Sequence, residues 1–168
     1  MKKLYMLAVL LLITVGASAQ EGKNIYNKYS SAKGVSAVYI SPSMFRLIGK
    51  LPQMQVEVGD DGQTMDIAPL IKSFSGFYML DISDKTTADA LAADISTMVS
   101  GDRSKKHYEL MMEVKDDGEN LRIYTAGDDK TIESFVFYCL SDDDVQFICI
   151  DGAMSREEVE ALIVKAAQ

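Results

Sequence analysis

The chain has 168 residues, and its 25 acidic side chains outnumber its 17 basic ones. A formal net charge of −8 repels nucleic acids and anionic lipids, because binding to either depends on lysine and arginine at the phosphates. Those partners are set aside. We expect one globular domain, since the length suits one core and only three prolines interrupt the chain.

The amino terminus has the pattern of a secretory signal peptide over residues 1–19. A basic start is followed by an apolar run over residues 4–15, which is too short to span a membrane, and by a small-residue cleavage site that ends at Ala19. No cysteine lies near this site, so we expect no lipid anchor. The mature protein should begin near Gln20 and be periplasmic or secreted, soluble and not membrane-spanning. Cleavage removes two lysines and no acid, which leaves 15 basic against 25 acidic residues and a formal net charge of −10.

Residues 20–33 are expected to form a polar amino-terminal segment ahead of a single α+β domain over residues 34–168. Ile25, Tyr26 and Tyr29 are spaced for one face of a short helix. We expect this helix to pack loosely on the domain.

The domain opens with an alternating segment over residues 35–40, which predicts a strand. Ser41 followed by Pro42 is typical of the start of a helix, and Gly49 with Pro52 should end it. The apolar stripe of this helix is Met44, Phe45, Leu47 and Ile48.

Four more elements are predicted before the centre of the chain. They are a hairpin over residues 55–67, a short helix over 68–74, a strand over 77–82 and a longer helix that ends near residue 100. Thr86 or Thr87 should cap the longer helix, and Gly101 should stop it. Its apolar stripe is Leu91, Ile95, Met98 and Val99.

Two pairs of segments resemble each other within the chain. VEVGDDGQTMDI at residues 56–67 aligns without gaps with MEVKDDGENLRI at 112–123, and FYMLD at 77–81 resembles FICID at 147–151. One interpretation is an ancient duplication of a hairpin-plus-βα unit. The other is that Asp-Asp-Gly is good turn chemistry used twice.

Residues 108–151 predict four consecutive antiparallel strands around which the fold is organised. In the first strand Tyr108, Leu110, Met112 and Val114 should share one side, with Glu109, Met111 and Glu113 on the other. Gly118 allows a tight turn into the second strand. The run over residues 132–140 is so apolar that we expect a central strand covered on both faces. The run over residues 145–150 is almost wholly apolar as well.

Both cysteines, Cys139 and Cys149, lie in the second of these hairpins. A short turn near Asp142 and Asp143 places Cys149 opposite Val136 and directs Cys139 to the other face. Adjacent strands in that register hold the sulfurs too far apart for a bond. We expect two buried free thiols; a disulfide, or a redox or metal role, is the alternative.

The chain closes with a helix over residues 155–167, in which Ser155 and Glu158 form a capping box. The fold class predicted is α+β: a largely antiparallel sheet of about six strands with helices packed on one face. The strands at 35–40 and 77–82 should join the four-stranded meander, and the helices at 86–100 and 155–167 should cover the sheet. A ferredoxin-like or duplicated version is an alternative.

Reactive residues are sparse. His107 is the sole histidine and is predicted to be a solvent-facing loop residue, and the chain has neither a nucleophile elbow nor a phosphate-binding loop. We therefore assign no catalytic, cofactor-binding or metal-binding residue, and expect that the protein is not an enzyme. The acids gather in turns without calcium-loop spacing, at Asp60, Asp61, Asp116, Asp117, Asp128, Asp129 and Asp142 to Asp144.

Methionine is abundant after residue 19. The eight positions are Met44, Met54, Met65, Met79, Met98, Met111, Met112 and Met154. Core packing is the ordinary interpretation, and a methionine-lined groove for apolar ligands or peptides is the alternative. Met111 does not fit the core-packing interpretation, because it lies on the outer side of its strand.

The segments VSAVYISPSMFRLIG, FYMLDIS and YELMMEVKDDGENLRIYT, with the closing strand and helix, resemble a family of small exported proteins of Bacteroides-type Gram-negative bacteria. That family is described only as a domain of unknown function. The resemblance covers roughly residues 30 to 165 and rests on turn and strand patterns. It implies an envelope location and brings no catalytic residue; many members carry a lipoprotein cysteine that this chain lacks.

Three functions remain open. The first is a non-catalytic exported binding or interaction module of the cell envelope, which uses a sheet face or the methionine-lined side to bind an envelope protein. The second is a periplasmic carrier or chaperone of an apolar small molecule, held in a cavity near Met98, Met111 and Phe135. The third is a carboxylate-based hydrolase with two acids from different turns across a cleft. The oligomeric state is left open.

Overall fold

The computed structural model describes residues 21–49, 55–58, 63–66, 68–101, 106–141 and 144–166. The predicted signal peptide and its cleavage site lie outside the described residues, as do Pro52, Met54, Asp60, Asp61, Asp142, Asp143 and the loop at 102–105. None of the described helices is both long and apolar enough to cross a membrane.

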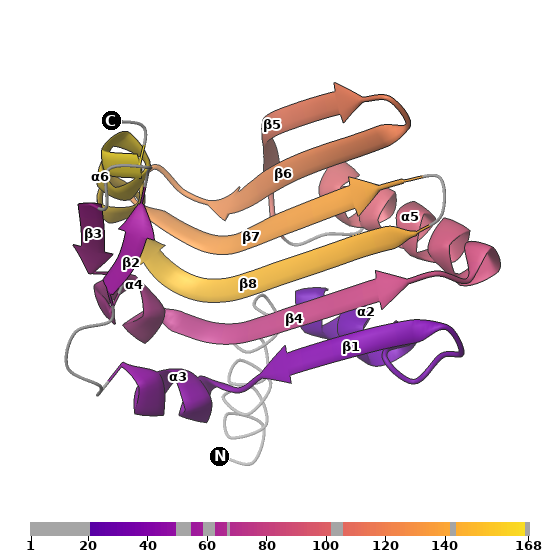
Figure 1. Cartoon of the computed structure of the whole chain (residues 1–168), viewed down its shortest axis with the longest axis horizontal. Coiled ribbons are helices and arrows are strands. Elements are labelled where there is room, and N and C mark those ends of the chain that lie inside the picture. The colour runs from indigo at the N-terminus through magenta and orange to yellow at the C-terminus, as the bar shows by residue number, and fades with distance from the viewer. Residues whose placement is uncertain are drawn as a thin grey trace, which may run out of the picture.

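The described part of the chain forms one large sheet, one small sheet and several helices (Figure 1). The large sheet contains β1 (Val35–Ile40), β4 (Phe74–Ile82), β5 (Tyr108–Asp116), β6 (Glu119–Gly127), β7 (Thr131–Leu140) and β8 (Val145–Ser155). The small sheet pairs β2 (Gln55–Val58) with β3 (Gln63–Asp66). The helices are α2 (Glu21–Tyr29), α3 (Pro42–Ile48), α4 (Ala68–Lys72), α5 (Lys85–Ser100) and α6 (Arg156–Ala166).

The six strands lie in the order β1-β4-β8-β7-β6-β5, and every neighbouring pair is antiparallel. β5 to β8 form a meander, and α5 carries the chain from β4 to the far edge at β5. The predicted α+β class is confirmed, as is the place of the 35–40 and 77–82 strands beside the meander.

The register of the second hairpin is the predicted one. Tyr138 pairs with Phe147, Leu140 with Val145, and Cys149 lies opposite Val136. Both cysteines are free, but only Cys149 is buried; Cys139 is half-buried, because it points to the other face of the sheet.

The helix starts are set by side-chain caps. Ser41 caps α3 by accepting a hydrogen bond from the Met44 amide, as predicted. In α6 the Glu158 amide donates to Ser155, which is the first half of the predicted capping box. The prediction for α5 was wrong: Asp84 caps this helix, and the Thr87 amide donates to its carboxylate over 2.9 Å.

The main core lies between the sheet and two helices. α2 and α5 cover one face of the sheet and share a cluster with alternate residues of β4, β7 and β8 (Figure 1). α2 packs closely, contrary to the expected loose packing, because its Gly22, Ile25 and Tyr29 are all buried. The prediction that the 86–100 and 155–167 helices cover the same face was wrong: Val159 of α6 belongs to a second, smaller cluster at one end of the sheet, with Phe135, whose side chain points away from α5.

Candidate functional site

The face of the sheet opposite α2 and α5 is the most distinctive surface of the molecule. Burial alternates along β4, β7 and β8 between buried and half-buried residues. The buried positions point to the helices, as the cluster that they share with α2 and α5 shows. The half-buried positions point the other way, and Figure 1 shows no labelled helix over the middle of that face. We call it the open face.

The open face carries an apolar band that crosses all six strands. The strand registers place its residues in three rows that run perpendicular to the strands. The first row contains Ile40, Phe77, Ile150 and Phe135; the second contains Val38, Met79, Ile148, Phe137, Ile123 and Met112; the third contains Cys139, Leu121 and Val114. None of these apolar residues is buried, and Val38, Met112 and Val114 are each about 45% exposed. The other positions are polar: the first row continues through the buried Thr125 to Glu109, and the third begins with Ser36, Asp81 and Gln146.

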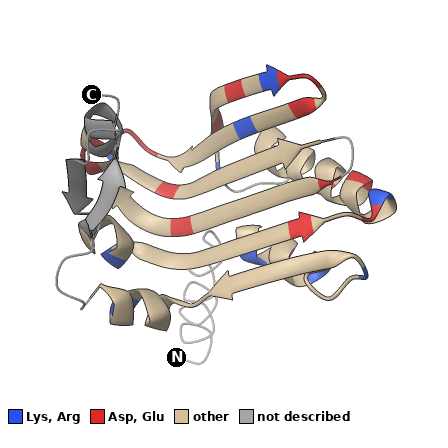
Figure 2. Ribbon diagram, viewed as in Figure 1, with Lys and Arg blue, Asp and Glu red and all other residues tan. Residues whose placement is uncertain are grey.

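The open face is bounded differently at its two ends. At one end Phe135 packs against the cluster that includes Val159 of α6 and Leu70 of α4. At the other end the third row becomes polar, where the Gln146 amide donates to the Asp81 carboxylate over 3.3 Å. Figure 2 shows few charged residues on β4, β8 and β7 between these ends. The middle of the face is therefore apolar and uncharged.

The edge strand β5 is exposed along nearly its whole length. Of its residues only Tyr108 is buried, while Leu110 and Met111 are each more than half exposed. The pairing with β6 shifts between Leu110 and Met112, which marks a β-bulge at Met111. This bulge makes the predicted facing wrong: Met112 and Val114 point to the open face, whereas Tyr108 and Leu110 point to the helix side. Met111 is exposed, as predicted.

A polar cluster lies buried on the helix side of the same strands. The Ser134 hydroxyl donates to Asp151 Oδ1 over 2.8 Å, and Lys106 Nζ lies 3.8 Å from the same oxygen. Cys149 Sγ lies 3.4 Å from Ser134 Oγ. Ser134 and Asp151 are almost inaccessible, and the Lys106 side chain is 3% exposed. The sequence analysis did not single out Lys106 and missed this ion pair.

The buried cluster is not arranged for nucleophilic chemistry. Burial raises the pKa of the Cys149 thiol, and the Asp151 charge raises it further, so Cys149 is held as a protonated thiol. Burial also raises the pKa of Asp151, against the Ser134 hydrogen bond and the Lys106 charge, which lower it. α2 seals the cluster, since a Cβ built on Gly22 would overlap the Cys149 side chain. A substrate therefore has no direct path to the sulfur.

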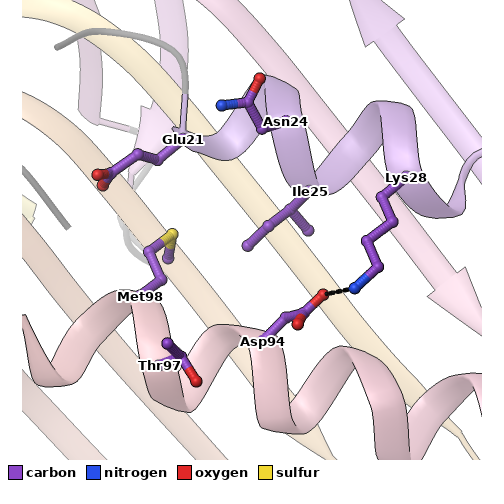
Figure 3. Close-up of a pocket in the computed structure, with 7 residues that line it drawn as sticks. All are labelled: Glu21, Asn24, Ile25, Lys28, Asp94, Thr97 and Met98. Atoms are coloured by element: carbon purple, nitrogen blue, oxygen red, sulfur yellow. Dashed lines mark hydrogen bonds and ion pairs between the residues drawn. The ribbon is translucent and has the colours of Figure 1, made fainter. Parts of the chain in front are cut away.

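A shallow groove of about 250 Å³ runs between α2 and α5 (Figure 3). Its lining residues are Glu21, Asn24, Ile25, Lys28, Asp94, Thr97 and Met98. Asp94 is already held by Lys28 and by the Tyr29 hydroxyl, which donates to it over 2.6 Å. These contacts hold α2 against α5, so the groove is a seam between two packed helices.

The other residues considered from the sequence are dispersed. His107 is exposed, as predicted, and Asp116, Asp117, Asp128 and Asp129 lie in exposed turns or strand ends. Within the described residues, no three His, Cys, Asp or Glu side chains lie close enough to hold a metal ion. Met98 of α5 lies in the core, Met111 is exposed on the edge strand and Phe135 lies on the open face, so these three residues do not line one groove.

The comparisons with known proteins concern the same part of the chain. A family model with the description "Domain of unknown function (DUF4252)" matches residues 29–162, which include β1 through β8 and both ends of the open face. Neither a curated protein nor a solved structure matches the chain. The predicted membership in a domain family of unknown function is confirmed: the chain belongs to the DUF4252 family.

Proposed function

We propose that this protein is a non-catalytic, exported binding module of the cell envelope, and that the open face is its docking surface. The observation that carries the proposal is the continuous apolar surface on a sheet whose other face already has its helices. Export rests on the signal-like pattern of residues 1–19.

The size of the open face supports a binding role. Each of its 13 apolar residues occupies about 4.8 Å across the strands and about 6.7 Å along them, which gives an apolar area of roughly 400 Å². The largest apolar patch on an ordinary monomer measures about 300–600 Å² and is often functional. Scattered exposed apolar residues need no explanation, but a patch of contiguous rows at this size favours an interaction surface.

Two features favour binding over catalysis. The buried Ser134, Cys149 and Asp151 are sealed under α2, and the thiol is held protonated. In the groove Asp94 is engaged by Lys28 and Tyr29. A hydrolase would need two carboxyl groups free to face a substrate.

The apolar-ligand carrier is the second candidate, and its requirement is specific. It needs an enclosed cavity near Met98, Met111 and Phe135. Met98, a residue of α5, is buried in the core, while Met111 lies on the exposed edge strand. In the described part of the chain these side chains line no common cavity, so the open face supports a macromolecular partner better than an enclosed small molecule.

Site-specific photo-crosslinking tests the proposal. A photo-reactive amino acid placed at Val38, Met112 or Val114, each exposed on the open face, should give adducts of discrete mass in the cell envelope. The matched controls are Leu110, on the other side of β5, and Leu47 on α3, both of which are at least half exposed. Equal adduct yields from open-face and control positions, or no adduct from any open-face position, would contradict the proposal.

A further inference from the structure

We infer that the partner on the open face is a second copy of this chain, so that two sheets pack face to face as a symmetric sandwich. This inference rests on the proposed function and names its partner. The docking surface is the open face defined above, from Val38 on β1 to Met112 and Val114 on β5.

The area is sufficient for a pair. With the polar positions of its first and third rows included, each open face covers roughly 500 Å², so two faces bury about 1,000 Å² in total, which is near the lower bound for a specific protein interface. Two sheets packed about 10 Å apart, with strands crossing at about 30°, interdigitate the side chains of their inner faces. Large apolar side chains such as Phe77, Phe137 and Ile148 suit this packing. The second row, which lies in the middle of the face, would bury no charge.

Symmetry fits the two unlike ends of the face. A two-fold axis that lies between the sheets and crosses the strands reverses the strand direction and keeps each strand at the same place along the axis. The α6 and α4 end of one copy then lies beyond the polar end of the other. The ends that carry α6 and α4 do not collide, because in the two copies they lie at opposite ends of the sandwich.

Charge favours the same axis. Arg46 on α3 and Lys72 on α4 are exposed beside the start of β4, where Phe45 of α3 packs against Phe74, and Asp81 lies near the other end of β4. An axis across the strands brings the Arg46 and Lys72 corner of one copy toward Asp81 of the other. An axis parallel to the strands would lay β4 of one copy over β6 of the other, and this pairing of opposite charges would be lost.

The edge strand is a poorer route to self-association. β5 presents apolar side chains, but the bulge at Met111 interrupts its outer ladder, and Glu109, Glu113 and Lys115 are charged. Bulges and charges are the devices by which sheet edges avoid pairing with another chain. The open face is accordingly a better self-complementary surface than the β5 edge.

Sedimentation equilibrium of the exported protein, expressed with its complete amino-terminal sequence, tests the inference. We expect a mass of two chains at micromolar concentrations. Val38→Glu and Met112→Glu should each weaken the dimer at least a hundredfold, because a two-fold axis brings every substitution into the interface twice, and about 1.4 kcal/mol per copy is a factor of ten. Leu110→Glu is the matched control on the other side of β5, and it should remain dimeric.

A second measurement uses the unmodified protein and does not depend on a variant that folds. Cys139 belongs to the open face and is half-buried in the single chain, so the dimer should shield it from a bulky maleimide. Its labelling rate should rise at least tenfold when the protein is diluted below the dimer dissociation constant. A rate that does not depend on protein concentration would overturn the inference.

The outcomes separate this inference from the proposed function. A monomer at every concentration, with open-face crosslinks to a different protein, overturns the second copy and leaves the binding module standing. A monomer without open-face crosslinks overturns both. A dimer that Leu110→Glu weakens as much as Met112→Glu uses another surface and also overturns the inference.

Discussion

Phe147 on β8 and Phe137 on β7 are aromatic residues of adjacent strands in one sheet, yet Phe147 is fully inaccessible and Phe137 is half-buried. The same difference separates Cys149 from Cys139 and Leu80 from Met79. The covered face has α2 and α5 over it, and among the described elements no helix covers the middle of the open face (Figure 1).

The difference shows where the stability of this fold comes from. The covered face excludes water from a cluster built by β4, β7, β8 and two helices, so its side chains gain the full transfer free energy of burial. The open-face side chains shield one another only laterally and keep part of their surface in water. They contribute less to folding, and retain a driving force for binding.

The largest expected effect is on thiol reactivity. In dilute native protein Cys139 should react with a maleimide at least a thousandfold faster than Cys149, because Cys149 is inaccessible and must wait for local or global unfolding. Mass spectrometry of peptides after timed labelling measures both rates. Comparable rates would mean that the two faces are equally open, and the contrast drawn above would fail.

A matched pair of truncations compares the packing of the two faces. Phe147→Ala should lower the free energy of unfolding by about 3–5 kcal/mol, since it removes a fully buried aromatic ring and leaves a cavity. Phe137→Ala should lower it by about 1 kcal/mol, because its ring is half-buried and its site stays open to water.

Urea unfolding at a concentration where the protein is monomeric measures both changes. Losses of equal size would show that Phe137 is as well covered as Phe147. At high protein concentration the inferred dimer adds to the apparent stability of the wild type. Phe137→Ala should then lower the free energy of unfolding by more, because it also weakens that dimer.

Much of the fold could be predicted from the sequence because local signals agree with it. Ser41-Pro42 begins a helix, Gly118 permits the β5–β6 turn with its φ of 92°, and the short turn after Leu140 fixes the register of β7 and β8. These features depend on neighbouring residues, which a sequence displays directly.

The open face could not be predicted, for a physical reason. An unbroken apolar strand such as β7 indicates that both of its faces avoid water, but the pattern is the same whether a helix of the same chain or another chain covers the second face. The bulge at Met111 leaves no mark either, because Leu110, Met111 and Met112 are all apolar and any of them could be the extra residue.

The buried ion pair did leave a signal that was missed. Asp151 follows Cys149 by two residues, and the predicted register turns Cys149 toward the covered face. An acid on the covered side of a strand requires a partner. Its partner Lys106 is 45 residues away along the chain, and no local pattern connects the two residues.

The smallest expected effect concerns that acid and depends on pH. Burial raises the pKa of Asp151 above its ordinary value of 3.8, so the folded protein binds this proton more tightly than the unfolded chain does. The resulting stabilisation is complete below the unfolded value and is lost as the pH rises through the folded value. Wild-type protein should therefore gain stability relative to Asp151→Asn as the pH falls from 7 toward 3.8, and urea unfolding of both proteins across that range measures the difference. A stability difference that stays constant, or that shrinks on acidification, would show that Lys106 and Ser134 outweigh burial and hold Asp151 as a carboxylate.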